Sequence, residues 1–236
     1  MQILIDIVAV VFGYLLGSIP FGLLIVKIKT GKDIRRVESG RTGGTNAMRA
    51  AGFSAGLLTA TMDILKGAAA VWLAQALNPE SNLIHILAPI AAILGHNYSI
   101  FLVERDKNGQ WHFRGGAGGA PALGGAMGLW WPMLPIVFSL GALVFFTLGI
   151  ASITTLAVAF FVTIIFTVRA WLGQMPWIDV IYGVVAEVIL IWALRPNIQK
   201  LLSGNERVVK YSLSGWLRSR KETEAESKTS HNELSR

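Results

Sequence analysis

The chain has 236 residues, of which 53% are hydrophobic and only 15% are charged, and its formal net charge is +7. Soluble domains carry about 25% charged residues, so this composition excludes an ordinary soluble protein and indicates a membrane protein. The absence of cysteine excludes disulfides, a thiolate nucleophile and cysteine-ligated metal sites. The basic residues lie in short loops between apolar segments, a pattern typical of membrane topology and not of nucleic-acid binding.

The first apolar segment, 3–26, is long enough to cross a bilayer, which requires about 20 residues. It carries Asp6 near its start, and lysines follow directly after its end. A cleaved signal peptide would instead begin with basic residues and end at a small-residue cleavage site. We therefore expect a transmembrane helix that is retained in the mature protein.

Further apolar segments predict an all-α fold, a polytopic bundle of about seven transmembrane helices. The expected helices are 3–26, 53–76, 83–102, 117–131, 133–149, 152–169 and 179–195. With seven crossings, all but two of the 21 Lys and Arg residues lie on one side, the exceptions being Lys66 and Arg169. The positive-inside rule then places the N-terminus outside and the C-terminus in the cytoplasm, as expected for a multi-pass protein of the inner or plasma membrane of the cell.

Residues 1–210 are expected to form the transmembrane domain, and the polar residues 211–236 to form a disordered cytoplasmic tail. Three charged residues fall within predicted spans, where charge is costly. Asp63 and Lys66 are three positions apart, on one helix face, and can neutralise each other. They either orient helices or support a polar site, and Glu187 is a possible further partner for Lys66.

The first basic loop contains glycine, hydroxyl and amide residues besides its arginines. It reads Ser39-Gly40-Arg41-Thr42-Gly43-Gly44-Thr45-Asn46, with Arg49 three residues later. Glycines let backbone N–H groups turn toward a ligand, and arginines add charge, which is how proteins hold phosphate without a nucleotide-binding P-loop. A loop that served topology alone would not need this cluster, so it predicts phosphate binding.

A second cluster begins with Gly95-His96-Asn97-Tyr98 and continues at 114–121, which is rich in glycine. This glycine run either holds a phosphate or lets helices approach closely, as we expect of Gly124 and Gly128. Between the two parts, Asn108-Gly109 is typical of a tight turn, so 104–113 is expected to be a projecting β-hairpin.

These motifs, in this order, resemble those of the bacterial integral-membrane glycerol-3-phosphate acyltransferases that use acyl phosphate as the acyl donor. The resemblance extends over about residues 5–207 and rests on several ordered segments. They are Gly17 to Gly22, Ser39 to Asn46 with Arg49, Asp63 to Gly67, Gly95-His96 with the later glycine run, and Arg195 to Glu206.

The resemblance implies acyl transfer from acyl phosphate to glycerol 3-phosphate within the lipid bilayer. The products would be lysophosphatidate and phosphate, in the first step of phospholipid synthesis, with no cofactor, no metal and no nucleic acid. It implies catalytic roles for Ser39, Asn46, Arg49, His96 and Asn197. It implies substrate-binding roles for Ser18, Arg41, Thr45, Arg114, Gly115, Gly116, Gly118, Ser152 and Arg195.

The chain departs from the family pattern at three positions. Arg41 stands where the family has Asn, Ala117 where it has Lys, and Leu194 where it has His. Arg41 and Arg114 are expected to restore the lost charge, because guanidinium groups bind phosphate well. The alternative is a divergent homologue without catalysis, a lipid-phosphate binder or a small transporter. We find no internal repeat of the kind that many transporters contain.

No histidine in this chain is followed five residues later by aspartate, the spacing of the catalytic dyad in soluble-type acyltransferases. Acyl phosphate already contains a good leaving group. Positioning and charge stabilisation by the loops are therefore expected to supply most of the catalysis.

Overall fold

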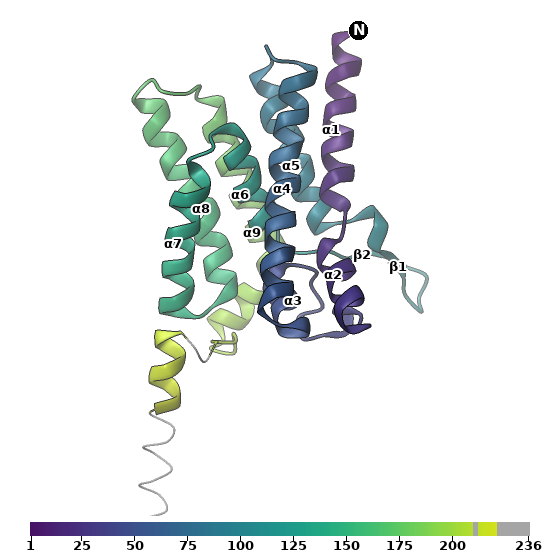
Figure 1. Ribbon diagram of the computed structural model, residues 1–236, viewed down its shortest axis with the longest axis vertical. Helices are drawn as coiled ribbons and strands as arrows, with labels where there is room; N and C mark the ends of the chain where they lie inside the picture. Colours follow the sequence, from purple (N-terminus) through teal and green to yellow (C-terminus); the bar gives the residue numbers. More distant parts are fainter. Residues whose placement is uncertain (210–211, 221–236) are drawn as a thin grey trace, which may run out of the picture.

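The computed structural model describes residues 1–209 and 212–220. Within these residues the chain is helical apart from one small hairpin (Figure 1). The helices are α1 (Gln2–Ser18), α2 (Phe21–Thr30), η1 (Ile34–Arg36), α3 (Gly44–Ala51), α4 (Phe53–Leu77), α5 (Asn82–Asn97), η2 (Ile100–Leu102), α6 (Gly119–Leu129), α7 (Met133–Leu148), α8 (Ala151–Trp171) and α9 (Ile178–Leu202). A further short helix covers 213–220.

Each of the seven predicted ranges contains a helix, and the predicted all-α class is confirmed. The first range differs from the prediction, because it is divided into α1 and α2 at Ile19 and Pro20. Proline has no N–H group and disfavours the helical conformation of the residue before it, which explains the break. The last helix also continues seven residues beyond the predicted end at 195, to Leu202.

Among the described residues, four helical stretches are long and apolar enough to cross a membrane. They are Gln2–Thr30, Phe53–Leu77, Asn82–Leu102 and Ala151–Trp171, and α7 is a shorter apolar helix. This supports a multi-pass membrane protein, as the hydropathy of the sequence predicted.

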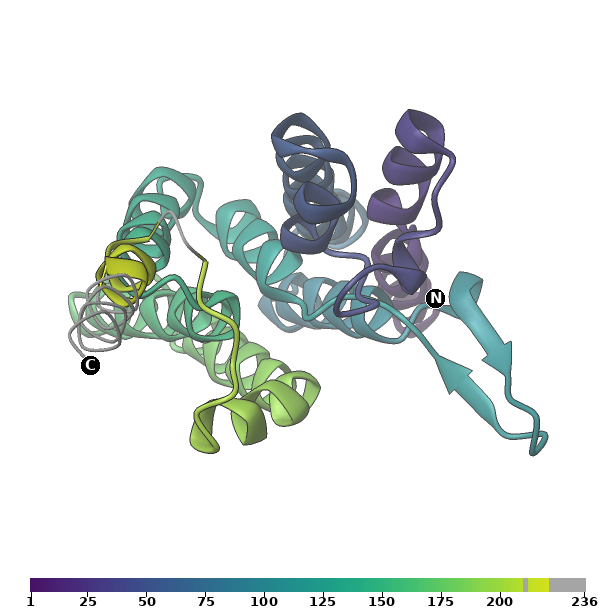
Figure 2. The same cartoon turned by 90° about the horizontal axis from the view of Figure 1, so that it is seen from below.

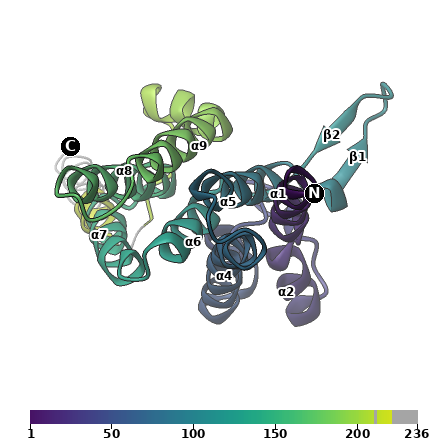
Figure 3. The same cartoon turned by 90° about the horizontal axis from the view of Figure 1, so that it is seen from above.

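Small residues allow the helices to approach closely. In the view from above (Figure 3), α1 lies against α5 and α4, and α6 lies between α4 and α8. Gly13 and Gly17 of α1 face the backbone of Ala88 and Ala92 in α5, where any side chain would collide. Gly124 of α6 faces the backbone of α4 in the same way, as predicted. Helices in lipid gain packing energy from such close approach.

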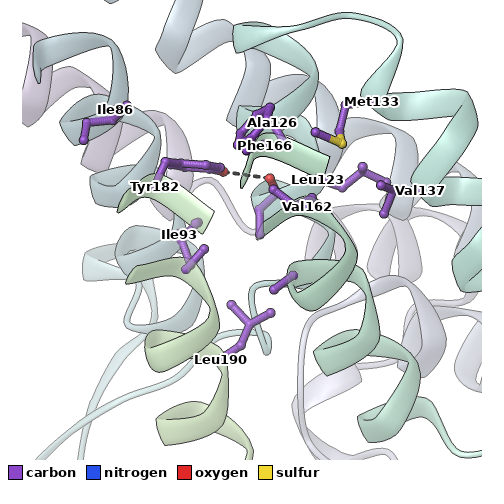
Figure 4. Packing of buried hydrophobic residues seen from close by; sticks show 13 residues of the cluster. Ile86, Ile93, Leu123, Ala126, Met133, Val137, Val162, Phe166, Tyr182 and Leu190 are labelled. Atoms are coloured by element: carbon purple, nitrogen blue, oxygen red, sulfur yellow. Dashed lines mark hydrogen bonds between the residues drawn. The ribbon is translucent and has the colours of Figure 1, made fainter. Parts of the chain in front are cut away.

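The largest buried cluster joins α5 to α9 through Tyr182 (Figure 4). Its hydroxyl donates a hydrogen bond of 2.7 Å to the carbonyl oxygen of Ala122 in α6, and its ring centroid lies 6.5 Å from that of Phe166 in α8. Because the phenol is fully buried, this bond satisfies its polar end. The cluster fixes α6, which carries the glycine run at its start, against the last two helices.

The connections that carry the predicted site residues gather at the end of the bundle opposite the N-terminus (Figures 1 and 2). The predicted hairpin is confirmed: β1 (Val103–Arg105) pairs antiparallel with β2 (Trp111–Phe113). After α9 the chain returns to the turn between α7 and α8, where the N–H of Val209 donates to the carbonyl oxygen of Gly149 at 2.9 Å. Of the predicted disordered tail, 211–236, residues 213–220 are helical, and residues 211 and 221–236 lie outside the described residues.

The buried ammonium group of Lys66 links α4, α5 and the break between α1 and α2. The Nζ atom of Lys66 in α4 lies 2.8 Å from Oδ1 of Asp63, 2.9 Å from Nδ1 of His96 in α5 and 3.0 Å from the carbonyl oxygen of Ile19 at the helix break. The predicted Asp63–Lys66 pair is therefore confirmed. Glu187 is not a partner of Lys66, whose three N–H groups match these three contacts.

We predict that Lys66→Met destabilises the protein by about 3–5 kcal/mol, because it leaves the Asp63 carboxylate buried without its cation. The double variant Asp63→Leu/Lys66→Met should recover part of this loss, because no charge is then left unpaired. Thermal unfolding of the three variants and the wild type in one detergent measures the effect. A double variant as unstable as the sum of the two single variants would contradict the pairing.

Candidate active site

Three cavities that share lining residues lie at the end of the bundle where the loops gather. Each is named after its position or a distinguishing neighbour. The tail cavity, of about 330 Å³, includes Lys200 and Arg207. The hairpin cavity, of about 240 Å³, includes Phe113 and Arg114. The inner cavity, of about 200 Å³, reaches His96, and Ser39 and Arg41 line all three cavities.

The inner cavity is lined by the first residues of two helices, α3 and α6. Each of these helices begins after a glycine, Gly43 and Gly118, and neither has a side-chain cap. The N–H groups of a first helical turn have no partner within the helix, and the helix dipole makes this end electropositive. Two such ends beside one cavity are suited to holding an anion.

Arg41 connects the first loop to the glycine run and to α9. Its guanidinium donates to the carbonyl oxygen of Gly116 at 3.2 Å, to that of Ala193 at 2.7 Å and to Oδ1 of Asn197 at 3.2 Å. Burial lowers the pKa of Arg41 from its ordinary value, yet a guanidinium remains cationic at neutral pH. Five N–H groups are available and three are used, so two remain for a ligand.

Asn46 determines the shape of the first loop. Its side-chain amide donates to the carbonyl oxygens of Ile34, Val37 and Arg41 at 3.3, 3.0 and 2.8 Å. The residue is buried, and its Oδ1 has no hydrogen-bond partner among the described residues although Asn46 lines the inner cavity. Asn46 is therefore a positioning residue for Arg41, with one acceptor left unsatisfied.

The start of the first loop is tied to the hairpin. Arg35 contacts Asp33 at 2.7 Å and Glu104 at 2.6 Å, and Glu104 also accepts from Nε of Arg114 at 2.7 Å. The hydrogen bond from Arg35 lowers the pKa of Asp33 to about 2. These contacts hold the two polar connections beside each other, and they restrain Arg114 through a carboxylate.

His96 lines the inner cavity and takes its orientation from Lys66. An ammonium group only donates, so Nδ1 of His96 accepts from Lys66, and the network assigns the ring hydrogen to Nε2. A side chain at Gly116 would collide with Nε2, and the N–H of Gly116 donates to the carbonyl oxygen of His96 at 2.9 Å. His96 is thus arranged as a hydrogen-bond donor and not as a base.

The tail cavity gathers cations from distant parts of the chain. Its basic lining residues are Arg41, Arg49, Lys200 and Arg207. Glu206 accepts from Asn197 at 2.9 Å and from the hydroxyl of Ser152 at 3.2 Å, while Arg207 forms an ion pair with Glu38. The carboxylates in this cavity are therefore engaged, which leaves Arg49 and Lys200 as its less restrained charges.

The sequence predictions placed most, but not all, of these residues in the site. The cavities bring together Ser39, Arg41, Thr45, Asn46, Arg49, His96, Arg114, Gly115, Gly116, Gly118, Ser152 and Asn197. They do not include Ser18, which is buried and donates to the carbonyl oxygen of Tyr14 at 2.9 Å. They do not include Arg195 either, whose guanidinium lies over the ring of Trp192 at 3.3 Å.

Several lining residues were not predicted as site residues, and they fall into two groups. Lys200, Glu206 and Arg207 belong to or follow the C-terminal motif, and their order in that motif was the available signal. Glu38 and Thr155 line the tail cavity without any motif of their own, so local sequence gave no signal for them.

Comparisons with known proteins point to one family. A family model described as "Glycerol-3-phosphate acyltransferase" matches residues 7–204. The glycerol-3-phosphate acyltransferase of Rubrobacter xylanophilus is 36% identical over 204 residues, covering 86% of this chain and 95% of the relative. Glycerol-3-phosphate acyltransferase 2 of Moorella thermoacetica is 38% identical over 207 residues, covering 85% and 95%.

Two solved structures have a similar fold, both of PlsY, an integral membrane glycerol 3-phosphate acyltransferase. The glycerol 3-phosphate form has a TM-score of 0.73 and 29% sequence identity, covering 86% of this chain and 95% of that chain. The lysophosphatidic acid form has a TM-score of 0.73 and 27% identity, covering 87% and 96%.

We predict that Asn46→Ala destabilises the protein by about 1–3 kcal/mol, because three backbone carbonyls of the first loop each lose a hydrogen bond from the buried amide. The matched control is Arg49→Ala in the same short helix, whose side chain forms no hydrogen bond or ion pair within the described residues, so the unfolding temperature should stay unchanged. Thermal unfolding in detergent distinguishes the two. Equal unfolding temperatures for both variants and the wild type would show that Asn46 does not hold the loop.

Proposed function

This chain belongs to the glycerol-3-phosphate acyltransferase family, and from this premise we propose that it acylates glycerol 3-phosphate with acyl phosphate as donor, at the three cavities that share Arg41. Acyl transfer to glycerol 3-phosphate is the activity of the family, and its product is lysophosphatidate. The observation that carries the proposed site is the meeting of the partly buried Arg41 guanidinium with two uncapped helix starts. Such a place is suited to two phosphate groups.

Charge and access suggest which substrate occupies which cavity. Glycerol 3-phosphate is water-soluble and enters from the aqueous side. The tail cavity has the most cations, and among them Arg49 and Lys200 are less restrained than Arg207. The acyl phosphate carries an apolar tail that favours the space among the helices, so its phosphate is assigned to the inner cavity beside the starts of α3 and α6. Arg41 lines both cavities and has two N–H groups left for the phosphates.

The reaction needs positioning more than a strong base. The hydroxyl of glycerol 3-phosphate attacks the acyl carbonyl carbon, the bond from that carbon to the phosphate oxygen breaks, and the hydroxyl proton leaves with the phosphate. The Nε2–H of His96 and the free N–H groups of Arg41 are the candidate donors for negative charge that develops on the carbonyl oxygen.

The membrane topology that fits this site has seven crossings, with the N-terminus outside and the C-terminus in the cytoplasm of the inner or plasma membrane. It is supported by the helices in all seven predicted ranges and by the gathering of the basic connections at the end that holds the cavities (Figure 1). Trp131, Trp171 and Trp177 are exposed at helix ends on the predicted outer side, where an aromatic belt is expected. The water-soluble substrate would then be supplied from the cytoplasm.

We predict that Arg49→Ala lowers turnover by about 100-fold or more while the protein remains folded, because the tail cavity loses one of its less restrained cations. Phosphate release from acyl phosphate, measured with and without glycerol 3-phosphate at matched protein concentration, gives the rate. Unchanged turnover in Arg49→Ala would remove the tail cavity from the site. A wild type that binds both substrates yet releases no phosphate would favour the alternative, a lipid-phosphate binder without catalysis.

A second prediction concerns the exchange of charge between positions 41 and 117. Both positions line the tail and inner cavities, so we expect Arg41 to replace the lysine that the family pattern has at Ala117. Arg41→Asn should lower turnover by about 100-fold, and Arg41→Asn/Ala117→Lys should recover part of the lost rate.

The matched control for this exchange is Arg114→Ala. Its effect should be smaller than that of Arg41→Asn, because Glu104 already holds the Arg114 side chain. If the double variant were no faster than Arg41→Asn alone, the two positions would not share one role.

A further inference from the structure

The β1–β2 hairpin is not used by the proposed reaction, and its two faces differ in chemistry. The register pairs Val103 with Phe113 and Arg105 with Trp111, so these four side chains share one face. Glu104 and His112 form the pair between them and occupy the other face. Trp111 is 64% exposed and Phe113 is 51% exposed, so among the described residues this face presents two aromatic side chains to its surroundings.

On the polar face of the hairpin, Glu104 is turned toward the protein, while the side chain of His112 remains 53% exposed. Glu104 contacts Arg35 at 2.6 Å in the first loop and Arg114 at 2.7 Å, while His112 contacts Asp106 at 2.9 Å in the turn. The Arg35–Glu104 ion pair ties the polar face to the first loop, while the other two contacts lie within the hairpin and the residue that follows it. The aromatic face is therefore turned away from that loop.

The chain fixes the hairpin near the boundary between the helices and water. β1 begins six residues after the end of α5 at Asn97, and β2 ends six residues before the start of α6 at Gly119. The hairpin leaves the bundle sideways at the level of α2 (Figure 1), and the view from above shows it extending beyond the helices (Figure 3). Ile100 and Phe101, which lead into it, are also exposed apolar residues.

Positive charge accompanies the aromatic face. The guanidinium of Arg105 lies 5.5 Å from the ring centre of Trp111, and Lys107 is exposed at the turn. Tryptophan with nearby cations is the combination that prefers the headgroup layer of a membrane, and anionic headgroups attract the cations further.

We propose that the aromatic face of this hairpin lies in the headgroup layer of the bilayer and binds anionic phospholipid headgroups. Trp111 and Phe113 enter the interface, and Arg105 and Lys107 contact the lipid phosphates. The hairpin so anchored holds Glu104, and through it Arg35 and the first loop, at a constant depth beside the membrane surface.

The absence of cysteine from the chain allows a direct test with single labels. Trp111→Cys, Phe113→Cys and the matched control His112→Cys, on the opposite face, are each labelled with an environment-sensitive fluorophore in the full chain. The proteins are placed in nanodiscs that contain phosphatidylglycerol. Quenching is then measured with nitroxide-labelled lipid and, separately, with acrylamide in the water. Val11→Cys, exposed on α1, is the reference for a site in contact with lipid.

We expect the labels at 111 and 113 to shift to shorter emission wavelength and to be quenched by the nitroxide lipid, as at Val11, while the label at 112 is quenched by acrylamide. Equal acrylamide quenching at all three hairpin positions would place the hairpin in water and overturn the proposal. Protection of 111 and 113 from both quenchers would also overturn it, because protein would then cover this face.

The role of the anionic headgroups is tested with Arg105→Gln/Lys107→Gln in the Phe113→Cys background. Quenching by nitroxide lipid should fall in discs with phosphatidylglycerol and should change little in discs of phosphatidylcholine alone. If the loss is the same in both kinds of disc, the cations do not bind anionic headgroups and that part of the proposal fails.

Discussion

An ammonium group inside a bilayer needs an acceptor for each of its N–H groups, and this requirement organises the polar end of the bundle. Lys66 finds its three partners in its own helix, in α5 and at the break between α1 and α2. The break at Pro20 frees the carbonyl oxygen of Ile19 from a continuous helix and so makes one of these contacts possible. Three helices thereby meet at one charge, at the depth where His96 borders the inner cavity.

From Lys66, a series of contacts continues outward to the loops. His96, oriented by Lys66, packs against Gly116, and Gly116 in turn accepts from Arg41. Arg41 then joins the first loop to α9 through Ala193 and Asn197. Lys66 therefore acts indirectly and away from any substrate. It orients His96, which packs against the glycine run, and its own charge is compensated by protein groups.

Hydropathy was sufficient to locate the helices, because apolar length is a strong and local signal in a membrane protein. The division of the first helix was missed, since Pro20 lies within a continuous apolar run and hydropathy does not register a missing N–H group. Ser18 and Arg195 were selected because they lie in motifs, but a motif does not specify where a side chain points. The side chain of Ser18 turns back onto its own helix, and that of Arg195 lies on the exposed indole ring of Trp192. Glu38 and Thr155 enter the site only because distant segments meet there, which no local pattern contains.

The contact of Glu206 with Asn197 and Ser152 has a consequence for how the protein is made. The first loop is synthesised early, but the tail cavity closes only when the chain after α9 returns to the turn before α8. A nascent chain still attached to the ribosome at α8 thus has its glycine run, Arg41 and Arg49, yet lacks Lys200, Arg207 and one wall of the cavity. Synthesis of the last helix and the few residues behind it therefore completes the cavity that is proposed to hold glycerol 3-phosphate.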